Sequence, residues 1–399
     1  MWGWFFCCIF AGNLLSIYLV FMNAFFAENL LFVAIWVFVL SFVVSYFALP
    51  SIIYVVKEKN LMDKPNQRSS HRVKTPTLGG LSFFISVVFT LFFLRAYDYD
   101  SVGINIISGL GVLFFVGLKD DLVGVYPSTK LLGQIIATLI LLFGTGLKIT
   151  TFDHFLGIDE IPYWLSLLFS CSIVMAIVNS YNLIDGINGS AAMVGIVIFG
   201  VFGYVFFLAS DYYYFLLSVL CIGFLLAFLR YNLSARKRVF MGDTGSMTVG
   251  FLLAVLAIKF FALRADGLEA LEIHPMNKLW VLLAIIFIPF FDTTRVFANR
   301  LIRNGRPFQA DRNHIHHVMI DYMRLSHTQA SLLLAAINFL VFVVVLSLNK
   351  VLSTLYLGIA FTVIYTGLAL LLFYVNRNYH TRKSKQKIRK VIRRVIKKK

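Results

Sequence analysis

The sequence predicts an all-α, polytopic integral membrane protein with about eleven transmembrane helices. Hydrophobic residues make up 59% of its 399 residues and charged residues only 14%, whereas charged residues form about a quarter of a typical soluble domain. Apolar runs of about 18 residues or more recur along the chain, which is the length that a helix needs to cross a bilayer. The runs do not alternate apolar with polar residues, so they do not indicate an outer-membrane barrel. These observations exclude a soluble enzyme, a disordered chain and a disulfide scaffold.

The apolar segments divide the chain into three parts. A stretch at 2–26 is either a twelfth span, an interfacial helix or an uncleaved signal, and it lacks the basic start and clear cleavage site of a removed signal. We therefore expect an apolar N-terminal segment 1–29, a single transmembrane domain 30–375 and a basic cytoplasmic tail 376–399. The eleven expected spans are 30–56, 78–95, 103–118, 131–147, 163–181, 190–208, 213–229, 245–263, 279–297, 329–348 and 353–375.

The distribution of basic residues predicts the orientation. The loops after odd-numbered spans and the tail hold 30 Lys and Arg, whereas the loops after even-numbered spans hold five. Positive loops stay inside, so the odd loops and the C-terminus are expected in the cytoplasm. The tail alone carries twelve Lys or Arg and no acid. Because it follows a membrane span, we expect it to bind anionic lipid headgroups and not nucleic acid.

Two adjacent carboxylates, Asp120 and Asp121, stand at the inner end of the third span, in the segment GLKDDLVG. Carboxylates at membrane helix ends are functional candidates by default. Neighbouring side chains on a helix point about 100° apart, so we expect one acid to face a cation and the other a proton. The alternative is a pair of solvated helix-end charges beside Lys119.

A polar stripe closes the fifth span, in NSYNLIDGINGS. Asn179, Asn182 and Asp185 are spaced by three residues and share one side of a helix. Gly186 and Gly189 follow and favour a helix break at which the backbone can approach a ligand. The negative end of the helix dipole there favours a cation. The alternative is a polar helix cap followed by a glycine turn.

A third motif, RKRVFMGDTGSM, leads directly into the eighth span. Phe240 precedes Gly242 and Asp243, and the backbone amides at the helix start are expected to bind phosphate. The carboxylate of Asp243 suits a hard cation with oxygen ligands. An ordinary N-cap is the alternative, but it leaves the two glycines, Gly242 and Gly245, unexplained.

A histidine cluster lies in the longest inner loop, in GRPFQADRNHIHH. Imidazole and guanidinium groups suit a diphosphate or a sugar. A zinc site and a set of solvent-exposed loop histidines are the alternatives, and no neighbouring cysteine supports zinc. The candidate residues are Asp311, Arg312, His314, His316 and His317.

Two further inner segments carry weaker signals. The loop DKPNQRSSHRVKTPTLGG, which contains Lys74, is either an anion-binding loop or a positive-inside loop that turns at prolines. In PFFDTTR, Asp292 is expected to pair with Arg295 near a helix end.

The motifs together supply oxygen ligands, cationic groups and helix-start amides on one membrane face. This combination is typical of metal-assisted phosphoryl transfer. The sequence has no Walker A loop, so an NTPase is disfavoured. A transporter would place its polar groups near the membrane midplane in paired halves, and a cation-binding scaffold would not need a diphosphate-like arrangement.

These five segments, from about residue 45 to 325, resemble the polyprenyl-phosphate N-acetylhexosamine-1-phosphate transferase family (glycosyltransferase family 4). The resemblance implies transfer of a sugar phosphate from a UDP-sugar to undecaprenyl or another polyprenyl phosphate, with Mg²⁺, or Mn²⁺ in its place, as cofactor and UMP as product. The domain 30–375 would then be catalytic, with its active site on the cytoplasmic face of the inner membrane. A homodimer is compatible with this resemblance.

The resemblance also implies roles for individual residues. Asn182 and Asp243 would bind the metal, and Phe240 would stack on uracil. Asp185 would lie near the nucleoside, and Lys74 would contact the nucleotide. The remaining family positions expected to bind substrate are Asn179, Asp311, Arg312, His314, His316 and His317.

The implied reaction begins at the two adjacent acids. Asp120 would deprotonate or orient the lipid phosphate for attack on the β-phosphorus, and Asp121 would assist the metal or a nearby Lys. A two-step route through an aspartyl-phosphate is the alternative. Because Ile315 interrupts the histidines, the chain looks closer to the branch that uses UDP-GlcNAc to initiate a surface glycan than to the peptidoglycan translocase, which uses UDP-MurNAc-pentapeptide.

Overall fold

The computed structural model describes residues 29–63, 75–98, 101–155, 157–263, 265–302 and 314–396, with the backbone alone beyond residue 375. The apolar stretch 2–26 lies outside the described residues. Lys74, Asp311 and Arg312 also lie outside them. The expectations for these positions therefore stay predictions.

Most of the described chain is helical, and it also contains two short hairpins. The hairpins pair β1 with β2 and β3 with β4, both antiparallel. The elements are α2 Leu30–Glu58, β1 Met62–Asp63, β2 Thr75–Pro76, α3 Gly80–Phe93, η1 Arg95–Tyr97, α4 Val102–Val123, α5 Pro127–Thr145, β3 Thr151–Phe155, β4 Ile158–Glu160, α6 Tyr163–Ile184, α7 Ser190–Leu208, α8 Tyr212–Asn232, α9 Gly242–Phe261, α10 Ala265–Glu269, η2 Pro275–Asn277, α11 Lys278–Ile285, α12 Phe287–Ile302, α13 Ile315–Asp321, α14 His327–Asn349 and α15 Thr354–Ile396.

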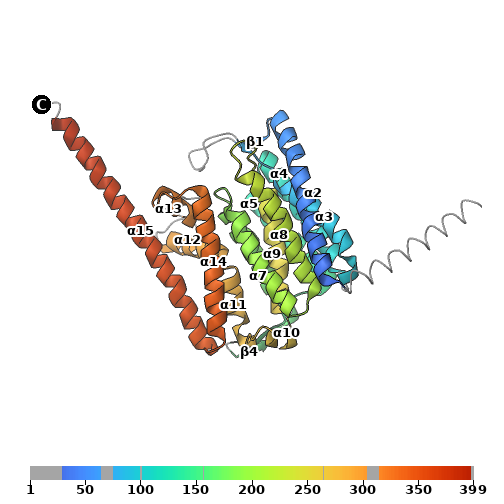
Figure 1. The fold of residues 1–399 in the computed structure, drawn as a ribbon. Helices are drawn as coiled ribbons and strands as arrows, with labels where there is room; N and C mark the ends of the chain where they lie inside the picture. Colours follow the sequence, from blue (N-terminus) through green and yellow to red (C-terminus); the bar gives the residue numbers. More distant parts are fainter. Residues whose placement is uncertain are drawn as a thin grey trace, which may run out of the picture.

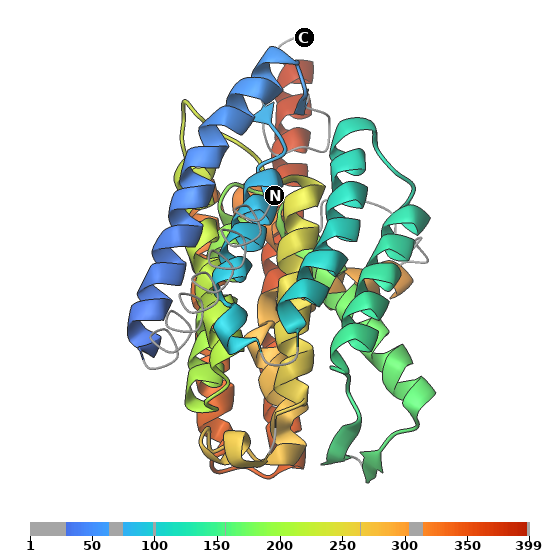
Figure 2. The ribbon, with the colours of Figure 1, turned by 90° about the vertical axis from the view of Figure 1, so that its right-hand side faces the viewer.

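The long helices form an upright bundle with distinct ends (Figure 1). The strand β1, helix α13 and the end of α15 lie at the upper end, whereas β4 and α10 lie at the lower end. The view turned by 90° shows α4 and α5 as a pair beside the central helices (Figure 2). The segments that carry the motifs therefore gather at the upper end.

The predicted fold class is confirmed, and the count of eleven crossings stays a prediction. Among the described residues, nine helices are long and apolar enough to span a membrane, and a bent pair makes a tenth candidate. The second expected span, 78–95, appears as α3, which has only 14 residues. At about 1.5 Å per residue this helix is shorter than a typical hydrocarbon core.

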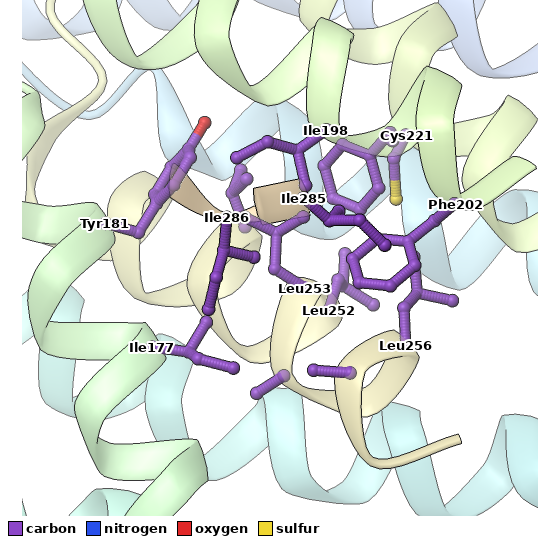
Figure 3. Close-up of a cluster of buried hydrophobic side chains, with 14 of the residues drawn as sticks. Ile177, Tyr181, Ile198, Phe202, Cys221, Leu252, Leu253, Leu256, Ile285 and Ile286 are labelled. Carbon is purple, nitrogen blue, oxygen red and sulfur yellow. The ribbon is translucent and has the colours of Figure 1, made fainter. Parts of the chain in front are cut away.

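Helix α9 is the central helix of the bundle. In its apolar window 94% of the residues are buried, against 22–67% for the other eight candidate spans. It packs against α3, α4 and α6. Figure 3 shows Leu252, Leu253 and Leu256 among buried side chains from α6, α7, α8 and α11. The start of α9 is thereby held rigidly at the upper end, where the third motif lies.

The ninth expected span, 279–297, is not one continuous helix. Helices α11 and α12 meet at Ile286 with a bend of 80°. The buried Asn338 of α14 bridges the break, because its Nδ2 donates to the Ile285 carbonyl (2.8 Å) and its Oδ1 accepts from the Ile288 amide (2.9 Å). Pro289 lies in the first turn of α12, where its missing N–H costs no helical hydrogen bond. The side-chain amide thus satisfies backbone groups that a break would otherwise leave unpaired.

Candidate active site

The last turn of α4 contacts the first turn of α9 through Asp121. Its Oδ1 accepts from the Asp243 amide (2.8 Å), and its Oδ2 accepts from the Thr244 amide (3.0 Å) and the Thr244 hydroxyl (2.6 Å). A carboxylate at a helix N-terminus is stabilised by the free amides and the helix dipole. We expected these amides to bind phosphate, but in the structure Asp121 occupies the two of them at Asp243 and Thr244.

The glycines of the third motif allow this close packing of helices. Gly242 has a φ of +72°, and a Cβ there would lie 2.6 Å from an oxygen of Asp121. A Cβ on Gly80 of α3 would clash with the backbone of Gly245. The two glycines that an ordinary N-cap leaves unexplained therefore have a packing reason, because Asp121 and α3 fill the space beside them.

Asp120 faces a different partner from its neighbour. Its Oδ1 accepts from the Val125 amide (2.8 Å), and its Oδ2 lies 2.5 Å from Nζ of Lys130. The same ammonium lies 3.0 Å from Oδ2 of Asp243. One lysine therefore bridges the carboxylates of α4 and α9.

Lys130 was not predicted as a site residue, because its sequence position indicates only a loop charge. A usable signal was present. Only residues 124–126 separate α4 from α5, so the first turn of α5 must lie beside the last turn of α4. A lysine there, four residues into α5, is held close to the two acids.

Two residues of the polar stripe of α6, Asn182 and Asn179, contact different helices. Asn182 donates from Nδ2 to Oδ1 of Asp243 and to the Ser246 hydroxyl (2.7 Å). The two expected metal ligands, Asn182 and Asp243, are therefore in contact. Asn179 exchanges hydrogen bonds with Gln134 of α5, at 2.8 and 3.3 Å. Its amide thus joins α5 to α6 in this structure, and its expected contact with substrate stays a prediction.

Asp185 follows the end of α6 and lies near the same acids. Loss of hydration raises the pKa of its carboxyl well above the usual range, and the negative charges of Asp243 and Asp121 raise this pKa further. A carboxyl with a raised pKa is a common feature of functional sites. It therefore binds a proton more readily than an ordinary aspartate.

The oxygen donors around Asp243 fit a magnesium ion better than a zinc ion. Within the described ranges, no group of three or more His, Cys, Asp or Glu side chains is arranged to hold a metal. Magnesium usually keeps several waters and takes only one or two carboxylates plus substrate phosphates. Asp243 and Asn182 supply such a small ligand set. The zinc alternative for the histidines gains no support.

The histidine cluster is held by Asp292 of α12. Its Oδ2 lies 2.8 Å from Nδ1 of His314, and its Oδ1 accepts from the Ile315 amide (2.8 Å). The same Oδ1 accepts from the Arg295 guanidinium at 2.9 Å, which confirms the expected pair. The contact with His314 was not predicted, although an acid within an apolar span was a signal for it.

Two of the three histidines are buried. His314 is 7% exposed and His316 2%, so the alternative of solvent-exposed loop histidines is wrong for both. The His316 ring packs so closely on Gly186 that a Cβ there would clash with Nε2. Burial lowers the pKa of His316 to about 3, so its imidazole is neutral at pH 7. The ring of His317 lies 4.4 Å from that of His316. Helix α13 therefore lies against the glycine turn of the second motif.

The end of the segment DKPNQRSSHRVKTPTLGG pairs with the third motif, RKRVFMGDTGSM, through backbone hydrogen bonds. The Phe240 amide donates to the Pro76 carbonyl (2.8 Å), and the Gly79 amide donates to the Phe240 carbonyl (3.0 Å). Phe240 is partly exposed. The chain that follows Lys74 therefore leads to the residue expected to stack on uracil.

These contacts define a helical membrane protein with a polar site at one end of its bundle. Residues 104–261, from α4 to α9, match the model of glycosyl transferase family 4. A protein of Yersinia pestis named undecaprenyl-phosphate alpha-N-acetylglucosaminyl 1-phosphate transferase is 30% identical over 267 residues, which cover 65% of this chain and 69% of the relative. The chain therefore belongs to glycosyl transferase family 4.

Two other relatives carry similar names. A Salmonella typhi protein with the same name is 29% identical over 297 residues, covering 70% of this chain and 76% of its own. A Bacillus subtilis (strain 168) protein named probable undecaprenyl-phosphate N-acetylglucosaminyl 1-phosphate transferase is 28% identical over 309 residues, covering 76% and 82%. The similarity thus extends beyond the family match at both ends.

Proposed function

We propose that this protein transfers N-acetylglucosamine-1-phosphate from UDP-GlcNAc to undecaprenyl phosphate, releasing UMP and starting a lipid-linked surface glycan. The observation that carries this proposal is the cluster of Asp120, Lys130, Asn182 and Asp243 at one end of a membrane bundle. The names of the relatives support the acceptor and the sugar phosphate. The resemblance supplies the UDP-linked donor.

Asp243 and Asn182 would hold the magnesium ion, and Mn²⁺ is the natural substitute. The bound ion would neutralise charge on the donor diphosphate. The side chains present support this assignment, because the Asn182 amide group lies against the Asp243 carboxylate and the Ser246 hydroxyl. In the structure the Asn182 side-chain nitrogen faces Asp243. A 180° turn of this amide would place its oxygen there instead, where it could bind a metal ion.

The chain's own residues act on the acceptor. Asp120 is restrained by the Val125 amide and by Lys130, so its carboxylate is poised to orient or deprotonate the lipid phosphate. Lys130 would attract that phosphate and keep the two carboxylates from repelling each other. Asp121 would act by fixing the start of α9, since its oxygens accept from Asp243 and Thr244. Direct attack by the lipid phosphate is the simpler route, because that phosphate is already an anion.

The donor would lie between the glycine turn and the histidines. Phe240 would stack on uracil, and Asp185 would donate to the nucleoside. His314, His316 and His317 would contact the sugar phosphate, together with Asp311 and Arg312. Lys74 would contact the nucleotide, and Asn179 would line the same side of α6.

The site is proposed to face the cytoplasm at the inner membrane. The tail carries twelve Lys or Arg, and the C-terminal end of α15 lies at the end of the bundle that carries β1 and α13 (Figure 1). Helix α15 continues through the tail to Ile396, which presents the basic residues on a helix beside the anionic leaflet. A second copy of the chain is a compatible partner.

A radiolabelled transfer assay tests this function. Purified protein in detergent is incubated with undecaprenyl phosphate, Mg²⁺ and either UDP-GlcNAc or UDP-MurNAc-pentapeptide. We expect a lipid-linked GlcNAc product and one UMP per turnover. Conversion of the pentapeptide donor alone would make the protein a translocase instead. No lipid product from any UDP-sugar would contradict the transferase assignment and favour a transporter or scaffold.

A further inference from the structure

Asp292 is a fully buried carboxylate that serves two segments at once. Its side chain is 0% exposed, and it receives hydrogen bonds from α12, from the α13 backbone and from His314. A buried carboxylate is costly unless it is paired and hydrogen-bonded. The Arg295 guanidinium, 2.9 Å away, supplies the compensating charge. All these contacts lie within the described residues.

The bend between α11 and α12 creates this position. A straight ninth span would carry its second half on along the bundle axis, whereas the 80° bend turns α12 away from that axis. Asn338 stabilises the bend. The turn brings Asp292 against the start of α13, although 22 residues separate Asp292 from His314.

The hydrogen bonds of Asp292 fix the backbone at the start of α13 and the orientation of the His314 ring. The bond to the Ile315 amide caps the start of α13. The bond to Nδ1 places the His314 proton on that nitrogen and leaves Nε2 for a ligand. The His314 and His316 rings then lie nearly parallel, 5.7 Å apart with an interplanar angle of 8°.

We propose that Asp292 is a positioning residue for phosphosugar transfer, acting through His314. The carboxylate holds the imidazole in one orientation and one tautomer, so that the lone pair of Nε2 can accept from a proton donor of the transferred sugar phosphate, such as a sugar hydroxyl. Arg295 supplies the opposite charge beside the carboxylate, 2.9 Å away. This inference rests on the proposed function, because it assumes that His314 contacts the transferred group.

The substitution Asp292→Asn separates this role from simple packing. Asparagine keeps the size of the side chain, and its oxygen still accepts from the Ile315 amide. Its NH₂ group then faces Nδ1 of His314, which must become an acceptor and move its proton to Nε2. A tautomer change of this kind lowers turnover in other carboxylate–histidine pairs without a change of geometry.

A double-mutant cycle with His314→Ala provides the test. We expect Asp292→Asn to lower kcat by at least about 10-fold, as loss of an outer hydrogen-bond partner commonly does, with a smaller change in KM for UDP-GlcNAc. In the His314→Ala background the same substitution should cost little more, because the residue through which it acts is gone. The matched control is Asp321→Asn at the exposed end of α13, which should leave kcat unchanged.

Two outcomes would overturn the proposal. One is an equal loss of kcat from Asp292→Asn with and without His314, which would mean an independent effect. The other is unchanged activity in Asp292→Asn. If Asp292→Asn does not fold, Asp292→Glu is measured in its place. Because glutamate keeps a carboxylate, we expect a kcat between those of wild type and His314→Ala. A kcat no higher than that of His314→Ala would refute the assignment.

A readout without turnover separates this proposal from the proposed function. Trypsin cleavage after Arg312 reports how firmly α13 is held at its start. Asp292→Ala should speed this cleavage at least several-fold relative to Asp321→Asn. If Asp292→Ala is cleaved faster but the unmutated protein transfers no sugar phosphate, the proposed function is contradicted, whereas the role of Asp292 in holding α13 is supported. Equal cleavage rates would contradict the holding of α13 itself.

Discussion

Asp120 and Asp121 are adjacent in the chain, yet they contact different groups. Asp120 pairs with Lys130, whereas Asp121 accepts from the start of α9. This divergence follows from the 100° between neighbouring helical side chains and was predicted from the sequence. Which acid takes which partner was not predictable, because the choice depends on the rotation of α4 relative to α9. That rotation is set by packing at Gly117 and Gly242.

Lys130 is the first residue whose removal tests the site. Lys130→Met keeps much of the side-chain length but leaves the Asp120 and Asp243 carboxylates without their shared cation. We expect turnover to fall by roughly 100-fold, as loss of one key electrostatic contact does. Initial rates at saturating UDP-GlcNAc measure this. Lys119→Met, at an exposed position of α4, is the control; equal losses in the two variants would remove Lys130 from the site.

His316 predicts a pH dependence of stability. Burial lowers its folded-state pKa from 6.5 to about 3, so below pH 6.5 the unfolded chain binds a proton that the folded chain rejects. His316 therefore makes the protein less stable as the pH falls from about 6.5 toward 3. The melting temperature should drop more steeply between pH 7.5 and 5 in wild type than in His316→Gln. Parallel curves for the two proteins would contradict a buried, neutral His316.

At the level of elements, apolar patterning predicted nearly all of the helices. Ten of the eleven expected spans correspond to one helix each, from 30–56 as α2 to 353–375 as the first half of α15, and the ninth is divided between α11 and α12. The bend in the ninth span was not predicted, because it depends on Asn338, a residue about 50 positions away in the chain. Local periodicity does not carry such long-range information. The same is true of the burial of His314 and His316.

Helix α4 offers a matched pair of glycines for testing how tightly it packs on α9. A Cβ on Gly117 would lie 2.6 Å from Cα of Thr244, whereas a Cβ on Gly111 meets nothing within 4 Å. Gly117→Ala should lower the melting temperature, because α4 must move away from the start of α9. Gly111→Ala should leave it unchanged or raise it slightly, since alanine is favoured over glycine in helices by about 1 kcal/mol. The reverse order would contradict the packing of α4 on α9.

At the level of the whole molecule, the charge asymmetry and the architecture agree. Among the described residues, β1, α13 and the end of the basic helix α15 lie at one end of the bundle (Figures 1 and 2). The composition therefore predicted where the site would gather. It did not predict the central position of α9, which follows from its packing against α3, α4, α6, α7 and α11.

Single-cysteine labelling tests the orientation of this assembly. Ser128 lies in the first turn of α5 near the site, and Ser101 precedes α4 at the other end. Both residues are exposed. In intact cells a membrane-impermeant maleimide should label a cysteine at 101 and not one at 128, and lysis should expose the latter. Labelling at 128 from outside would contradict a cytoplasmic site.

The dependence of rate on Mg²⁺ concentration in Asp243→Asn tests the central claim most directly. Asp243 contacts Asn182, Lys130 and Asp121 through its side chain and backbone, so every part of the proposed site meets there. Asparagine keeps the size but removes the charge, and we expect a fold with near-normal melting. Turnover should fall by about 100-fold or more, with a higher Mg²⁺ requirement for the residual rate. Near-normal turnover with an unchanged Mg²⁺ requirement would contradict the placement of the metal and the reaction at Asp243.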